Sequence, residues 1–176
     1  MKLLRLLAIC LVIIQSNSEC FAQDSIPWKS SYKLKWQDFR GVPDRGSDRV
    51  AITVSNIGYS LSYNSTSFTV RIKCVFDKRK SWTTTLDSLV LIHEQGHFDI
   101  SEIFARKLRK AFKEYKFNGK TVQADLKEIF TRINSERRLY NEVYDIETNS
   151  SQNQTMQHQW NKKIADELLA LKAYAE

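Results

Sequence analysis

The sequence is poor in histidine, cysteine, proline and glycine, with 3, 3, 2 and 5 of them in 176 residues. Two of the cysteines, Cys10 and Cys20, lie in the amino-terminal segment, so a chain that loses this segment keeps Cys74 alone. One cysteine cannot form an internal disulfide, so stability must come from the core and from any bound metal. Because Cys74 lies in a strand-like run, we expect a buried structural thiol rather than a reactive one.

The sequence also lacks internal repeats and a basic stripe with interleaved aromatic residues. Its 27 Lys and Arg exceed its 20 Asp and Glu and give a net charge of +7, but the basic residues are scattered. This pattern does not favour nucleic acid as a partner. The apolar run at residues 6–14 is too short to cross a bilayer. The length predicts one domain, and the sequence does not define an oligomeric state.

The amino-terminal segment has the three parts of a secretory signal peptide. A short basic start is followed by the apolar run and then by Cys20-Phe21-Ala22, with small residues at the spacing of a cleavage site. The sequence therefore predicts a signal peptide at residues 1–22 and a mature domain at residues 23–176, located in the periplasm or outside the cell. An uncleaved anchor and a lipoprotein are alternatives, but neither cysteine of this segment has the small-residue context of lipid attachment.

The first half of the mature chain has the pattern of strands. Residues 23–32 are polar and are expected to be loose, whereas residues 50–63 are rich in β-branched and aromatic residues and fit a strand pair or one bulged strand. The clearest alternation is found at Phe68, Val70, Ile72, Cys74 and Phe76. We expect an antiparallel sheet of about three or four strands.

The second half has the pattern of helices. Residues 84–87 fit a capping box that opens a helix continuing to about Tyr115. A second helix is expected at residues 122–143, and a third at about residues 156–173. The predicted fold class is α+β, a single domain in which a small antiparallel sheet packs beside one long helix and two further helices.

The first predicted helix contains the sequence His93-Glu94-Gln95-Gly96-His97, which has the pattern His-Glu-x-x-His. Residues four apart lie on one face of a helix, so both imidazoles can bind one tetrahedral Zn²⁺. Glu94 can reach a metal-bound water and act as general base of a metallopeptidase. The histidines fill a gap in the apolar stripe of this helix, so we expect both to face the core. This context predicts a zincin-like metal site.

A zinc site of this kind needs a third protein ligand and leaves a fourth position for water. Ile103 stands six residues after His97, which excludes the extended motif with a third histidine there. The remaining candidates are Asp145 and Glu147, in an acidic cluster at the end of the second predicted helix, and the lone His158.

At this point the chain resembles a known family. The string His93-Glu94-Gln95-Gly96-His97-Phe98-Asp99-Ile100, the preceding Trp36-x-Asp38-Phe39-x-Gly41-x-Pro43 and the following Tyr144-Asp145-x-Glu147-Thr148-Asn149 are similar to the bacterial domain of unknown function 922, described as secreted zinc-dependent proteases. The resemblance covers nearly the whole mature chain. It implies a zinc-peptidase-like domain that is exported to the cell envelope, and it names no substrate.

One departure from the family pattern concerns the acidic cluster. The family pattern reads Tyr-Asp-x-x-Thr-x-His-Gly, and Ser150 and Ser151 stand where His and Gly are expected. The match at Tyr144 and Asp145 favours Asp145 as the third ligand over Glu147 and His158. The resemblance also suggests that Tyr144 stabilises the tetrahedral intermediate. If the missing histidine is a ligand or stabilises the oxyanion, this chain is impaired.

The sequence therefore predicts a secreted or periplasmic zinc metallopeptidase acting on a peptide or protein. His93, His97 and Asp145 would bind Zn²⁺, while Glu94 and Tyr144 would be catalytic. The alternative is a catalytically impaired envelope protein that binds metal or peptide.

Overall fold

The computed structural model describes residues 24–176, so the predicted signal peptide at residues 1–22 lies outside the described residues. The described elements, in chain order, are β1 (Ser25–Pro27), the 3-10 turn η1 (Trp36–Asp38), β2 (Ala51–Ile52), β3 (Ser55–Tyr63), β4 (Phe68–Asp77), β5 (Trp82–Thr83), α2 (Ser88–Glu114), α3 (Val122–Thr148), α4 (Gln154–Ala170) and the 3-10 turn η2 (Lys172–Tyr174). The fold class is α+β, as predicted. No helix within residues 24–176 is both long and apolar enough to cross a membrane.

The main sheet is antiparallel and has the strand order β1-β4-β3. In β4 the alternation predicted from the sequence holds, because Ile72, Cys74 and Phe76 are buried on one face. Ile57 of β3 lies opposite Cys74 in the register. The prediction of a buried Cys74 thiol is confirmed, since the residue is 3% exposed and burial raises its pKa.

The strand predictions need two corrections. Residues 23–32 were expected to be loose, yet β1 pairs with β4, where Ile26 lies opposite Phe76. Residues 50–63 form two strands that belong to different sheets, because β2 pairs with β5 while β3 pairs with β4. Because β2 pairs with β5, Arg49, which lies two residues before β2, borders the same pocket as Val90 in the first turn of α2.

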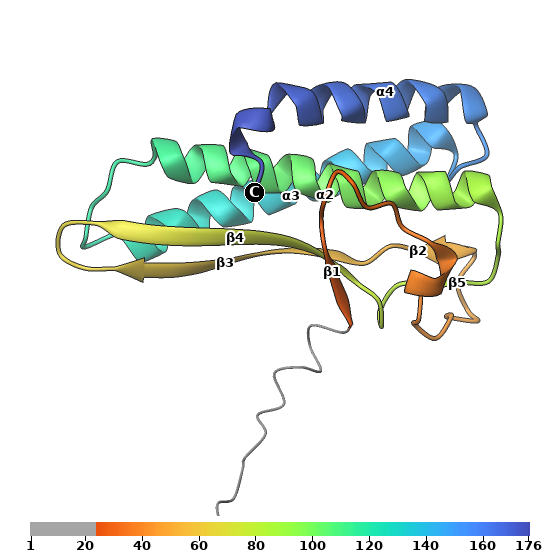
Figure 1. The fold of residues 1–176 in the computed structure, drawn as a ribbon, viewed down its shortest axis with the longest axis horizontal. Helices are drawn as coiled ribbons and strands as arrows, with labels where there is room; N and C mark the ends of the chain where they lie inside the picture. The colour runs from red at the N-terminus through yellow and green to blue at the C-terminus, as the bar shows by residue number, and fades with distance from the viewer. Residues whose placement is uncertain (1–23) are drawn as a thin grey trace, which may run out of the picture.

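The helix α2 is central to the fold, because it contacts the main sheet, α3 and α4. Figure 1 shows it lying along the sheet, with α3 beside it and α4 on the side away from the sheet. Its apolar face buries Phe98, Leu108 and Phe112 against the sheet and the other helices. This packing stabilises the helix that contains the His-Glu-x-x-His sequence.

The ends of the helices differ from the prediction in ways that affect the site. The cap of α2 is Asp87, whose carboxylate accepts a hydrogen bond from the backbone of Leu89 at 2.7 Å. The predicted cap, Thr84, instead donates its backbone N–H to Val50 beside the β2–β5 pair. The second helix was expected to end at residue 143, but α3 continues to Thr148 and therefore includes Asp145.

Candidate metal centre

Three donor atoms from α2 and α3 converge on one point. His93 Nε2 lies 3.2 Å from His97 Nε2, and Asp145 Oδ1 lies 3.1 Å from the first and 2.9 Å from the second. Ligand atoms ~2.0–2.1 Å from a tetrahedral zinc ion lie about 3.3 Å from one another. The three donors thus have the spacing of three corners of such a tetrahedron. They form a group that could hold a metal ion.

The side chain of Gln157, on α4, orients His93. Its Oε1 lies 3.0 Å from His93 Nδ1, and its Nε2 donates to the Tyr144 hydroxyl at 2.7 Å. Because the amide nitrogen is used by Tyr144, the amide oxygen faces the imidazole and accepts its Nδ1–H. This bond leaves a lone pair on His93 Nε2, the atom that faces the other donors.

Asn141, on α3, orients the imidazole of His97 in the same way. Its Oδ1 lies 2.7 Å from His97 Nδ1, while its Nδ2 donates to the carbonyl oxygen of Arg137 at 2.9 Å. The second bond again fixes which end of the amide faces the imidazole. Both histidines are therefore held with Nε2 free to bind a metal, as supporting residues do in metal sites.

The space between the three donors favours positive charge. Burial lowers the pKa of His97, but its hydrogen bond with Asp145 and the negative charges of Glu94 and Asp145 outweigh this, so that the pKa is raised. Burial raises the pKa of Asp145, yet hydrogen bonds from His93 and His97 hold it well below its usual range. A metal cation bound in this space would take the place of the protons through which the two imidazoles otherwise contact Asp145.

Arg49 orients the carboxylate of Asp145 from the opposite side. Its Nη1 and Nη2 donate to Asp145 Oδ2 at 3.1 and 3.2 Å. Because Oδ2 is used in this way, Oδ1 is the oxygen that faces the histidines.

Glu94 lies beside the three donors and is 4% exposed. Its Oε2 is buried and has no hydrogen-bond partner among residues 24–176. The residue borders two pockets, one of about 310 Å³ that also contains His97 and one of about 340 Å³ that also contains His93. A buried carboxylate oxygen without a partner is costly, so Oε2 is left free to form a hydrogen bond with a water or substrate group bound beside it.

Tyr144 packs behind the site rather than facing the pockets. Its ring stacks on that of His93, with centroids 4.6 Å apart and planes 13° apart, and its hydroxyl donates to the carbonyl oxygen of His93 at 3.1 Å. The side chain is fully buried, and burial raises the pKa of its hydroxyl. This geometry favours a positioning role for Tyr144, and its catalytic role stays a prediction.

The close approach of Tyr144 explains the glycine inside the motif. A methyl group at Gly96 would lie 2.8 Å from Cζ of Tyr144 and nearer still to the hydroxyl oxygen. Any larger residue at this position would force the tyrosine away from His93. Gly96 is therefore required by packing between α2 and α3.

We expect Gly96→Ala to lower the free energy of unfolding by about 1–3 kcal/mol through overpacking. At an unhindered position inside a helix, Gly→Ala raises the free energy of unfolding by about 1 kcal/mol. A decrease at Gly96 would therefore indicate the close contact with Tyr144. Thermal unfolding of the metal-free protein measures it. Adding Tyr144→Phe, which removes the nearest atom, should recover part of the loss. A Gly96→Ala variant more stable than the wild type would contradict this packing.

The structure separates Asp145 from the other two candidate ligands. Glu147 points away from the metal group and accepts a hydrogen bond from Trp160 Nε1 at 2.7 Å. His158 is exposed on α4. Neither residue belongs to the metal-binding group found within residues 24–176, whose third member is Asp145.

The two serines that depart from the family pattern form the turn after α3. Ser150 and Ser151 both have positive φ angles, of 48° and 79°, and at 79° the backbone favours glycine. Ser150 borders the same pocket as His93 and Glu94. A side chain at position 150 thus lies beside the candidate site, where a histidine could contribute to binding or catalysis.

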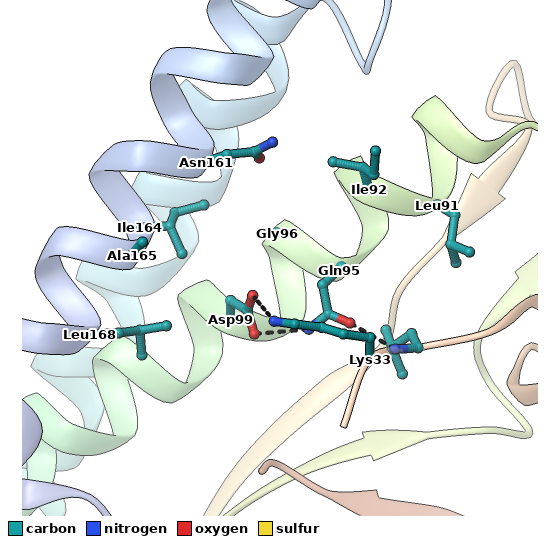
Figure 2. A pocket seen from close by; sticks show the side chains of 11 residues that line it. Lys33, Leu91, Ile92, Gln95, Gly96, Asp99, Asn161, Ile164, Ala165 and Leu168 are labelled. Carbon is teal, nitrogen blue, oxygen red and sulfur yellow. Dashed lines mark hydrogen bonds and ion pairs between the residues drawn. The ribbon is translucent and has the colours of Figure 1, made fainter. Parts of the chain in front are cut away.

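Another pocket, of about 420 Å³, lies on the other face of α2, between this helix and α4. Figure 2 shows Ile92 of α2 on the side of Asn161 and Ile164 of α4, whereas Gln95 points toward Lys33 and is bonded to Asp99. None of the three candidate metal donors lines this pocket. Its lining is mainly apolar, so we do not assign the metal chemistry to it.

Sequence reasoning missed the residues that support the donors, namely Gln157, Asn141 and Arg49. Asn141 carried a usable signal, since it precedes Asp145 by four residues and so shares its helix face. Gln157 and Arg49 carried none, because their contacts depend on how α4 and the β2 loop pack.

We expect Gln157→Leu to weaken metal binding by roughly 10–100-fold, because His93 loses the acceptor that fixes its tautomer. The measurement is a competition titration against a chelating dye. Gln159→Leu is the matched control, since Gln159 is exposed on the same helix. Equal affinities for the two variants would show that Gln157 does not orient the ligand.

Comparison with known proteins identifies a family. No curated protein and no solved structure matches the chain. A family match covers residues 21–153, which include the three candidate donors but end before Gln157. On this match the chain belongs to the family described as bacterial protein of unknown function (DUF922).

Proposed function

We propose that this protein is an exported, zinc-dependent peptidase of the zincin-like type. The observation that carries the proposal is the buried carboxylate oxygen of Glu94, which has no partner among residues 24–176 and lies beside the convergent donors of His93, His97 and Asp145. A metal site with only a structural role has no need of such a carboxylate. A general base needs to be close to the metal and free to take a proton.

The donor set supports zinc as the metal. Two imidazole nitrogens and one carboxylate oxygen, at tetrahedral spacing, are typical of catalytic zinc sites. Bound there, zinc would supply a water with a lowered pKa and would polarise the substrate carbonyl. Magnesium and calcium prefer sites made of oxygen ligands alone.

In this proposal each residue near the metal has one task. Glu94 takes a proton from the attacking water on Oε2 and later passes it to the leaving amine. Asn141 and Gln157 hold the imidazoles, and Tyr144 holds the backbone of His93 in place. The start of β3, an edge strand, lines the pocket that contains Glu94, so an extended peptide could pair with that edge.

The alternative is a catalytically impaired protein that binds metal or peptide in the cell envelope. It is favoured by Ser150, which borders the site where the family pattern has histidine. Against it stands the intact Glu94, which is needed only for chemistry.

The experiment that tests the proposal uses the mature chain from Gln23 onward, loaded with zinc, and a mixture of unstructured peptides analysed by mass spectrometry. We expect new peptide termini that appear with time, disappear on treatment with a zinc chelator and return when zinc is restored. Binding of zinc without any cleavage would support the impaired alternative instead.

A further inference from the structure

The pocket on the His97 side of the metal group contains two arginines. It has a volume of about 310 Å³ and is bordered by Arg49 and Arg137 as well as by Glu94. Arg49 is already paired with Asp145. Arg137 has no carboxylate partner among residues 24–176, so its positive charge is not paired in a salt bridge there.

In the described part of the chain, the guanidinium of Arg137 is held in place by neutral groups. Its Nη1 donates to the carbonyl oxygen of Ser55 at 3.2 Å and to Ser101 Oγ at 3.0 Å. Its Nε is buried and has no partner among the described residues. A partly buried charge that is fixed but not neutralised is costly. An anion bound in the pocket would remove that cost.

Arg137 is also linked to the candidate metal site by the helix geometry. Arg137, Asn141 and Asp145 follow one another at intervals of four, so they lie along one face of α3. The rise of the helix separates the first from the last by about 12 Å along its axis. Ser101, which accepts from Arg137, donates to the carbonyl oxygen of His97 at 3.1 Å. A peptide at the metal can therefore reach Arg137 with a group a few residues away.

We propose that Arg137 binds a carboxylate of the peptide substrate. The planar fork of a guanidinium matches a carboxylate, and partial burial strengthens the pair. The carboxylate comes either from the carboxyl terminus of the peptide or from an Asp or Glu side chain. This inference rests on the proposed peptidase function, for which it names the substrate class.

The test measures binding rather than turnover, with zinc-loaded Glu94→Gln protein and three acetylated tripeptides. Acetyl-Ala-Ala-Ala has a terminal carboxylate, acetyl-Ala-Asp-Ala-amide has a side-chain carboxylate, and acetyl-Ala-Ala-Ala-amide has neither. We expect one of the acidic peptides to bind roughly 10–100-fold more tightly than the neutral amide. Which acidic peptide binds tells the two sources of carboxylate apart.

Arg137→Gln should abolish this preference without changing zinc content, and Arg137→Lys should retain only part of it. The matched control is Arg138→Gln, because Arg138 is exposed on the same helix and faces Glu142. Equal binding of all three peptides to the Glu94→Gln protein overturns the inference, and this readout does not require that Arg137→Gln folds. A preference for the acidic peptides that survives in folded Arg137→Gln also overturns the inference, since the carboxylate then binds the metal.

Absence of peptide cleavage by the wild type would instead count against the proposed function alone.

Discussion

Glu94→Gln should reduce peptide cleavage by roughly 10²–10⁴-fold while zinc binding stays close to that of the wild type. The reason is that Glu94 lies beside the three donors but is not one of them. Glutamine keeps the size of the side chain and removes the basic oxygen. Cleavage rates of the zinc-loaded proteins, measured beside zinc content, check both halves of this expectation.

The matched control is Glu114→Gln, which removes a carboxylate from the exposed end of the same helix. It should cleave peptides at the wild-type rate. If Glu94→Gln cleaves as fast as the control, the general base lies elsewhere. If it loses zinc, Glu94 is a ligand and the assignment of the three donors is wrong.

Asp145→Asn should weaken zinc binding by more than the roughly 10–100-fold that follows loss of a supporting residue. The change removes the negative charge from the donor that lies 3.1 Å and 2.9 Å from the two imidazole nitrogens. A carboxylate is much the better zinc ligand, although the amide has nearly the same shape. Competition titration with a chelating dye gives the affinity.

Three further variants decide between the candidate third ligands. Glu142→Gln removes an exposed carboxylate of α3 and should bind zinc as the wild type does. Glu147→Gln and His158→Ala should also leave the affinity unchanged, because both side chains lie outside the donor group. If Asp145→Asn binds zinc with wild-type affinity while Glu147→Gln or His158→Ala loses affinity, the residue changed in that variant is the third ligand.

Much of the fold was predictable because it depends on local patterns. The alternation of Ile72, Cys74 and Phe76 predicted β4, and helical periodicity predicted α2, α3 and α4. The strand β1 was not predictable, because Ser25–Pro27 is short and gains its structure only by pairing with β4. The start of α2 was predicted too early, since Thr84 could cap a helix but is bonded to Val50 instead.

Part of the candidate site was also predictable from local sequence patterns. His93, Glu94 and His97 are separated by less than two helical turns, so their relation is local. The residue pattern left the third donor open between Asp145, Glu147 and His158, and only the resemblance to the family favoured Asp145. Residues two positions apart in a helix are separated by about 200° around its axis. Asp145 and Glu147 therefore cannot both face α2. Which of them does is decided by the packing of α3, and this packing is not local.

Two of the supporting residues, Gln157 and Arg49, could not be predicted, because each comes from a segment distant in sequence from the donor that it contacts. Gln157 reaches His93 only after the chain reverses through the turn at Ser150 and Ser151, whose positive φ angles start α4 in its direction. Arg49 reaches Asp145 across 96 positions of sequence. Such contacts depend on tertiary packing, for which no local pattern exists.

The measurement that tests the central claim most directly is the zinc content of the purified mature chain, beside that of a His93→Ala/His97→Ala double variant. We expect one zinc ion per wild-type chain and none in the double variant, with both proteins folded by circular dichroism. A wild-type chain that holds no zinc after zinc has been offered and the excess removed would contradict the metal site and, with it, the proposed peptidase.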